Sequence, residues 1–144
     1  MPRGEADERR AIERLINEYG HFVDGRDWDG LRAVFTDDVV FDSTDFGRPV
    51  REGFQRLRDD FAAYGDRHPI CHHATNVVVD LIDDDSARAR SKGLCITGEG
   101  TVFSCVYVDD ATRTPQGWRI RKRVALRRRP WDQASEAQLT PAQF

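Results

Sequence analysis

Residues 12–42 read IERLINEYGHFVDGRDWDGLRAVFTDDVVFD, and the spacing of apolar side chains in this stretch decides the fold. The first apolar positions are Ile12, Leu15, Ile16, Tyr19, Phe22 and Val23. Their intervals of three and four residues predict one face of an amphipathic helix. Gly25 can end that helix, and WDGLRAVF repeats the spacing in a short second helix. DVVFDS, residues 38–43, then predicts a brief strand.

The remainder of the chain changes from helical spacing to alternation. A third helix is expected from about Arg51 to Tyr64, and GDRHP ends it because glycine and proline both interrupt helices. Four alternating segments separated by turn sequences then predict antiparallel strands. These segments lie near 72–82, 87–97, 101–109 and 118–128. Helices followed by a meander of strands predict an α+β domain, with helices on one face of a curved antiparallel sheet.

Length and charge limit the class of protein. The 144 residues fit one domain, which we place at residues 1–129, followed by a polar, proline-broken tail at 130–144. A net charge of −3 gives no basic field that would attract nucleic acid, so a small molecule or a protein is the expected partner. The N-terminal residues lack the apolar core of a signal peptide and no apolar run could span a bilayer. We therefore expect a cytoplasmic protein without membrane contact, whose three cysteines stay reduced.

Three motifs, taken in order, resemble a known family. They are the opening stretch at 12–42, HHATNVVVD at 72–80 and GWRIRKR at 117–123. Together they resemble the SnoaL-like group of the nuclear transport factor two-like superfold, and VDGRDWDGLR at 23–32 is particularly similar to scytalone dehydratase. The resemblance implies a cone-shaped, cystatin-like fold in which about three N-terminal helices pack on a strongly curved antiparallel sheet and enclose an apolar cavity. Members include polyketide cyclases, dehydratases, isomerases and proteins without catalysis, so the fold leaves the function open.

Asp24 and His72 are the expected catalytic pair. Asp24 follows the apolar stripe of the first helix, where a turn could direct its carboxylate under the sheet, and it matches the aspartate that the dehydratase families place beside a histidine. His72 matches the active histidine of the family, at the start of its first long strand. Because strand side chains alternate, His72 and Asn76 should share one face and His73 should point the other way. A solvated aspartate and a structural histidine are the alternative interpretations.

An Asp–His pair in an apolar cavity suits dehydration or a double-bond shift. Both reactions need a base that takes an activated proton and an acid that returns one, and imidazole can do both near neutral pH. A carboxylate would fix the imidazole tautomer and stabilise the imidazolium. Cys71, His72, His73 and His68 could also suggest zinc, but alternation points Cys71 and His73 away from His72 and no second cluster has ligand spacing. We therefore expect no metal and no cofactor.

Further site residues follow from the resemblance. Tyr19 matches a tyrosine that related bile-acid dehydratases place near their Asp and His, and we expect it to assist catalysis; a tyrosine on an apolar stripe can also be a core residue. Arg123 matches an arginine that can meet the substrate, but plain alternation puts it opposite Trp118 and Ile120 unless a bulge intervenes. The other residues expected to contact substrate are Asn76, Thr97 and Trp28.

The chain departs from scytalone dehydratase at two positions. Thr97 stands where that enzyme has a second catalytic histidine, and Ser43 stands where it has a tyrosine. We therefore expect a cofactor-independent lyase or isomerase for a small hydrophobic cyclic ketone or polyketide-like substrate, rather than a literal scytalone dehydratase. A non-catalytic binding module for apolar molecules and a structural subunit like the small subunits of ring-hydroxylating dioxygenases stay open as alternatives.

Two expectations concern assembly and the tail. Surplus aromatic and apolar surface on the last two strands, together with the resemblance, predicts a homodimer through the sheet face. The residues that carry this argument are Phe103, Tyr107, Trp118 and Ile120. The apolar residues of the tail are Trp131, Leu139 and Phe144. We expect them to cover the cavity as a lid, and a frayed terminus is the alternative.

Overall fold

The computed structural model describes residues 4–130 of the chain. The helices in this range are α1 (Glu5–Asp24), α2 (Trp28–Arg32) and α3 (Phe54–Tyr64). The strands are β1 (Phe35–Asp42), β2 (Arg51–Glu52), β3 (Cys71–Leu81), β4 (Ser86–Ile96), β5 (Val102–Thr114) and β6 (Gly117–Arg127). Short 3-10 turns lie at Thr44–Phe46 and Gly65–Arg67. Helices first and strands afterwards confirm the predicted α+β class.

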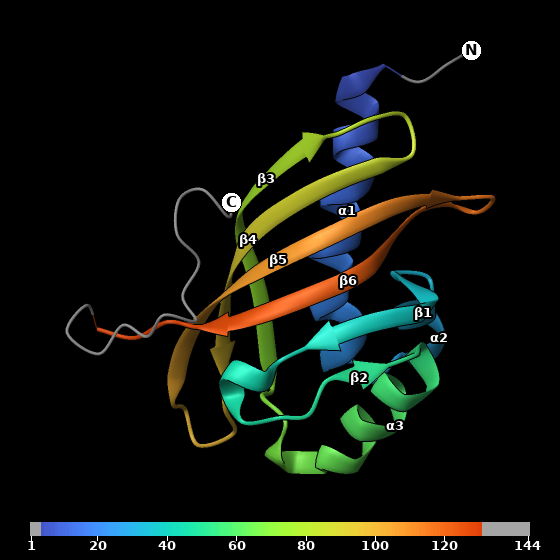
Figure 1. Ribbon diagram of the computed structural model, residues 1–144. Coiled ribbons are helices and arrows are strands. Elements are labelled where there is room, and N and C mark those ends of the chain that lie inside the picture. Colours follow the sequence, from blue (N-terminus) through green and yellow to red (C-terminus); the bar gives the residue numbers. More distant parts are fainter. Residues whose placement is uncertain (1–3, 131–144) are drawn as a thin grey trace.

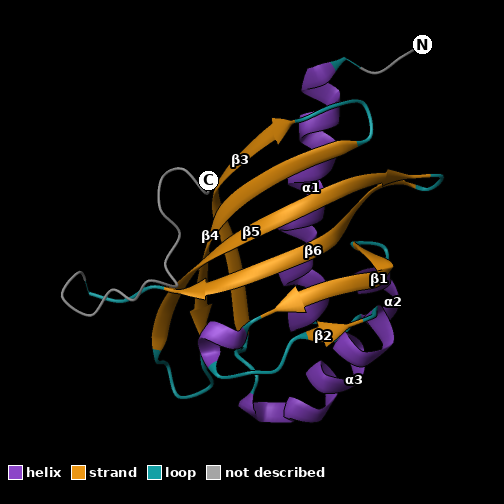
Figure 2. Ribbon diagram, viewed as in Figure 1, coloured by secondary structure: helices purple, strands orange, loops and turns teal. Residues whose placement is uncertain are grey.

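The six described strands form one sheet in the order β2, β1, β6, β5, β4, β3. One pair, β1 and β6, runs parallel, because the chain crosses the whole sheet between them; the other neighbours are antiparallel. Figures 1 and 2 show the long strands curving across α1, with α3 beside the short strands β1 and β2. The helices therefore cover one face of a bent sheet, as the sequence predicts.

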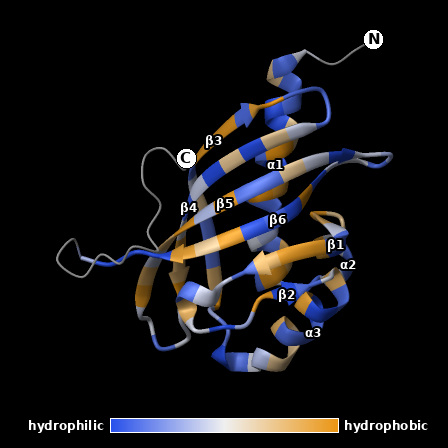
Figure 3. Cartoon of the chain, in the orientation of Figure 1, coloured by the Kyte–Doolittle hydropathy of each residue, from blue (hydrophilic) through white to orange (hydrophobic). Residues whose placement is uncertain are grey.

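The core lies between α1 and the inner face of the sheet. Ile12, Ile16, Tyr19 and Val23 are buried along one side of α1, whereas Arg14 pairs with Glu18 on the other side. Figure 3 shows this pattern as alternating hydrophobic and hydrophilic bands along the helix. The three- and four-residue spacing of the apolar side chains thus determines which side of α1 faces the sheet.

Gly20 allows α1 to approach β3 very closely. A methyl group at this position would lie 2.2 Å from the backbone carbonyl oxygen of His72, which is too close for any side chain. The glycine therefore lets the last turn of α1 rest directly on the start of β3. Asp24 and His72, which lie on these two segments, are brought together by this contact.

The third helix begins later than the sequence predicts. Arg51 and Glu52 pair with β1 as β2, opposite Phe41 and Val40, so helical spacing does not start before Phe54. Gly53 separates the two elements with a φ of 87°, a left-handed conformation that glycine adopts at little cost. The prediction of a helix from Arg51 is therefore wrong at its N-terminal end.

A bulge in β6 decides which way Arg123 points. Asp110 pairs with Lys122 and Ala111 pairs with Ile120, so Arg121 is an extra residue in β6. The extra residue shifts the alternation and places Arg123 on the same inner face as Ile120. The sequence left this orientation open, and the bulge settles it.

The aromatic and apolar residues on which the homodimer prediction rests pack within the chain itself. Tyr107, Trp118 and Ile120 are 5%, 3% and 0% exposed, and Phe103 is half-buried beside the cavity described below. They therefore provide no surplus aromatic surface for a partner. The homodimer remains a prediction that rests on the resemblance alone.

The described residues bear only in part on the expected tail and on the expected lack of membrane contact. The prediction that Trp131, Leu139 and Phe144 form a lid lies outside residues 4–130, and so does most of the proposed tail. Within that described range, no helix is both long enough and apolar enough to cross a membrane. The division into residues 1–129 and 130–144 stays a prediction.

The close contact at Gly20 predicts a large effect of a single methyl group. Gly20→Ala should lower the free energy of unfolding by roughly 2 kcal/mol, because the clash with a backbone oxygen exceeds the gain in helix propensity of about 1 kcal/mol. Urea denaturation followed by circular dichroism measures this. Gly98→Ala is the matched control, since its methyl group would have its nearest neighbour at 3.9 Å. Equal stability of Gly20→Ala and the unchanged chain would contradict the close approach.

Candidate active site

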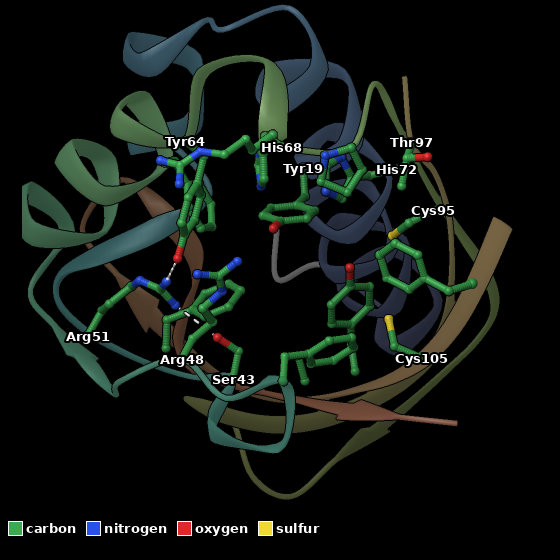
Figure 4. A pocket seen from close by; sticks show the side chains of 18 residues that line it. Tyr19, Ser43, Arg48, Arg51, Tyr64, His68, His72, Cys95, Thr97 and Cys105 are labelled. Carbon is green, nitrogen blue, oxygen red and sulfur yellow. Dashed lines mark hydrogen bonds between the residues drawn. The ribbon is translucent and has the colours of Figure 1, made fainter. Parts of the chain in front are cut away.

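A cavity of about 280 Å³ opens at the end of the cone where α1, α3 and the sheet meet. Its walls come from both helices and from all six described strands. Figure 4 shows the lining side chains converging from these elements on a common space. Aromatic lining residues are Tyr19, Phe41, Phe46, Phe61, Tyr64, Phe103 and Tyr107. The predicted cavity is therefore present, although arginine and histidine side chains also line it.

The carboxylate of Asp24 holds His72 at two points. Asp24 Oδ1 lies 2.7 Å from His72 Nδ1, and Asp24 Oδ2 accepts a hydrogen bond of 3.0 Å from the backbone N–H of His72. The His72 side chain is only 7% exposed and lines the cavity, whereas Asp24 is 27% exposed. The two expected residues therefore meet, with the imidazole inside the cavity and the carboxylate behind it.

This contact fixes the tautomer of His72. An ionised carboxylate can only accept hydrogen bonds, so Nδ1 must carry the proton that lies between the two side chains. Burial lowers the pKa of His72 below its ordinary value of 6.5, and this effect outweighs the hydrogen bond and charge of Asp24, which raise the pKa. At neutral pH the ring is therefore neutral, with an unprotonated Nε2 available as a base.

Tyr19 lies beside His72 with its hydroxyl directed into the cavity (Figure 4). The two rings meet edge-on, with centroids 6.0 Å apart. Burial raises the pKa of Tyr19 strongly, while the charge of Arg123 lowers it to a smaller extent. The phenol thus stays protonated and can donate a hydrogen bond to a bound oxygen.

Arg123 lies behind this wall of the cavity. Its guanidinium is fully buried between the rings of Tyr19 and Tyr107, 4.4 and 4.3 Å from their centroids. It forms two hydrogen bonds to Asp109, at 2.7 and 2.8 Å. Arg123 is not among the side chains that line the cavity, so its expected contact with substrate gains no support from the lining and stays a prediction. The ion pair supports Tyr19 from behind.

Of the three other residues expected to contact substrate, one lines the cavity and two do not. Thr97 lines the cavity. Asn76 does not, because β3 shifts register between Thr75 and Val78 and Asn76 adopts a φ of 53°, which leaves it exposed beside a different hollow. Trp28 lies on α2 beside Phe54, also outside the cavity. The register shift in β3 therefore breaks the alternation of side chains that predicted a shared face for His72 and Asn76. Trp28 lies on a helix that does not reach the cavity.

His68 is a cavity residue that the sequence did not assign a function. Its ring lies 4.9 Å from the ring of His72 and 5.0 and 5.6 Å from the rings of Phe61 and Tyr64. Burial, followed by repulsion from His72 when that ring is protonated and from Arg26, Arg51 and Arg48, lowers the pKa of His68 to about 3. Its position four residues before His72, in a chain with four histidines, was the available sequence signal.

Several further lining residues could not be assigned from sequence. They are Ser43, Arg48, Arg51, Tyr64, Cys95 and Cys105. Both cysteines are free thiols on neighbouring strands. Among residues 4–130, no three His, Cys, Asp or Glu side chains gather to hold a metal ion. Of the two histidines that line the cavity, His68 stacks on Tyr64, whereas His72 meets Tyr19 edge-on.

Comparison with known proteins places the chain in a family. Residues 4–124 match the model of the SnoaL-like domain, so the chain belongs to this family. An uncharacterized protein of Mycobacterium tuberculosis is 29% identical over 126 residues, which cover 83% of this chain and 85% of the relative. The predicted family is thereby confirmed.

Solved structures show the same fold. A nuclear transport factor two-like protein with a cystatin-like fold from Novosphingobium aromaticivorans superimposes with a TM-score of 0.77 at 21% identity, covering 92% of this chain and 87% of that one. A proposed scytalone dehydratase from the same species has a TM-score of 0.73 at 20% identity, covering 92% of both chains. At these identities the likeness supports the fold alone.

The low pKa of His68 predicts a loss of stability in acid. Between about pH 6.5 and pH 3 the unfolded chain binds a proton at His68 that the folded chain excludes, so the stabilisation present above pH 6.5 falls as the pH is lowered. His68→Phe keeps the aromatic packing and should remove a slope of at most about 1.4 kcal/mol per pH unit.

Urea denaturation at several pH values between 4 and 7 measures that slope. His21→Phe is the control, because His21 is exposed on α1. The prediction is wrong if His68→Phe and the unchanged chain lose stability in parallel over this range.

Proposed function

We propose that this SnoaL-like protein is a cofactor-independent lyase or isomerase that acts on a small hydrophobic cyclic ketone or polyketide-like molecule. The observation that carries the proposal is the two-point contact between Asp24 and His72, which leaves a neutral imidazole nitrogen available at a cavity. A base of this kind removes a proton activated by a neighbouring carbonyl group. Dehydration and a double-bond shift both begin with that step.

His72 carries the proton between two positions of the substrate. Nε2 takes the proton from carbon, and the imidazolium that forms is stabilised by the adjacent carboxylate of Asp24, 2.7 Å from Nδ1. The same Nε2–H then protonates a leaving hydroxyl group, which departs as water, or the distant carbon of a shifted double bond. One histidine thus serves as base and acid, and the second histidine of scytalone dehydratase is not required.

Tyr19 stabilises the enolate that forms between the two proton transfers. Its hydroxyl points into the same cavity and stays protonated, so it can donate a hydrogen bond to the substrate oxygen as negative charge develops there. Arg123 strengthens the phenol as a donor because its positive charge lies 4.4 Å from the ring centroid. Arg123 acts through Tyr19 and is a positioning residue.

The cavity would also suit a non-catalytic binding protein. A pocket that only encloses an apolar molecule has no need for a carboxylate that orients a buried histidine, and burying the imidazole carries a desolvation cost. This cost supports catalysis over simple binding. The structural-subunit alternative has no comparable supporting contact among the described residues.

Substitution of the pair tests the proposal. Proton–deuterium exchange at the activated carbon of 2-tetralone and dehydration of 3-hydroxycyclohexanone to cyclohexenone follow the two halves of the reaction. Asp24→Asn and His72→Gln should each lower the rate by about 10²- to 10⁴-fold. The double variant should lose about as much as either single variant, because the two residues act as a unit.

Asp66→Asn supplies the control, since it removes an exposed carboxylate from the turn before β3. Its rate should equal that of the unchanged chain. Full activity of Asp24→Asn, or additive losses in the double variant, would rule out a working pair.

A further inference from the structure

The wall of the cavity away from Asp24 is built around arginine. Figure 4 shows Ser43, Arg48, Arg51 and Tyr64 together on the opposite side from Cys95 and Thr97. Arg67 also lines the cavity, and none of the lining residues is Asp or Glu. The cavity therefore has a wall rich in arginine, and its lining residues include no acidic side chain.

Arg51 fixes two hydroxyl groups in this wall. It is 2% exposed, and it donates from Nε to Asp60 at 3.0 Å, from Nη1 to Ser43 Oγ at 2.8 Å and from Nη2 to the hydroxyl oxygen of Tyr64. A guanidinium only donates, so both hydroxyl oxygens act as acceptors toward it. Each hydroxyl keeps its own proton for another acceptor. Arg51 thereby prepares two oriented donors whose oxygens it also polarises.

Arg48 adds a free positive charge beside these hydroxyls. Its guanidinium lies 4.7 Å from the centroid of the Tyr64 ring and points into the cavity (Figure 4). Arg56, Arg58 and Arg129 each pair with an aspartate, but Arg48 has no acidic partner within residues 4–130. Stacking orients the plane of the guanidinium and leaves its N–H groups available to a ligand.

We propose that Arg48, Ser43 and Tyr64 bind a carboxylate of the substrate. The inference rests on the proposed function and narrows its substrate to a cyclic keto acid, held by its carboxylate at one wall while the carbon that loses a proton faces His72. A planar carboxylate matches the fork of a guanidinium and accepts hydrogen bonds from both hydroxyls. Phe41 and Phe61, which pack edge-on at the cavity, provide apolar contact for the ring. A volume of about 280 Å³ suits one or two fused rings.

Binding of a matched acid and ester tests this assignment without turnover. The probes are 2-naphthoate and methyl 2-naphthoate, titrated into the full chain by calorimetry at low ionic strength. We expect the acid to bind about tenfold more tightly than the ester, a preference that salt should reduce. Arg48→Gln should remove the preference by weakening the acid and leaving the ester unchanged.

Two further variants separate the possible outcomes. Arg58→Gln removes a charge from an exposed arginine on α3 and should keep the full preference. His72→Gln should also keep it, because the carboxylate site does not include the base; loss of turnover with retained acid binding would therefore separate this site from catalysis. Equal affinity for acid and ester, a preference that survives Arg48→Gln, or no measurable binding of 2-naphthoate would overturn the assignment.

Discussion

The carboxylate of Asp24 connects the end of α1 to the start of β3, and the position of His72 depends on this connection. A negative charge at the C-terminal end of a helix is unfavourable, because the exposed carbonyl groups there carry partial negative charge. The backbone N–H and the imidazole of His72 offset that cost by hydrogen bonding to both carboxylate oxygens. Gly20 makes the arrangement possible by allowing the helix to touch the strand backbone one turn earlier. The same contact closes the cone and orients the proposed base.

A buried ion pair supports one wall of the site. Arg123 and Asp109 are both fully buried on neighbouring strands and form two hydrogen bonds with each other. Removing either partner would leave an uncompensated charge in the core, which typically costs about 3–5 kcal/mol. Since Tyr19 and Tyr107 pack on this guanidinium, the pair holds the aromatic wall beside His72 in place. Stability of the core and geometry of the site are therefore linked.

The sequence predicted those parts of the fold that depend on regular spacing. The apolar stripe of α1 and the alternation in β4, where Ala87, Ala89 and Cys95 are buried, follow directly from periods of 3.6 and 2. Motif matching then brought Asp24 and His72 together although they are 48 residues apart in the chain. The orientations that the sequence left open or predicted wrongly lie at local departures from regular spacing. An extra residue in β6 at Arg121 and the left-handed Asn76 in β3 each shifted the alternation, and neither carries a glycine or proline that would signal it.

The arginine side chains of the cavity wall could not be predicted from the sequence, for a different reason. Arg51 fits the helical spacing that follows it, and its role depends on pairing with β1, a contact between separate segments. Arg48 resembles many other arginines in a chain with 22 basic residues. Its distinction is its place at the cavity, over the ring of Tyr64, which only the fold reveals.

The central claim is that Asp24 holds His72 as a neutral imidazole with its proton on Nδ1, so that Nε2 is free to act as a base. Nitrogen-15 NMR of the histidine side chains at neutral pH tests this most directly, with His72→Gln used to assign the resonances. We predict a neutral His72 ring protonated at Nδ1, and Asp24→Asn should abolish the preference for that tautomer. A His72 ring that is protonated on both nitrogens at neutral pH, or neutral with its proton on Nε2, would contradict the account.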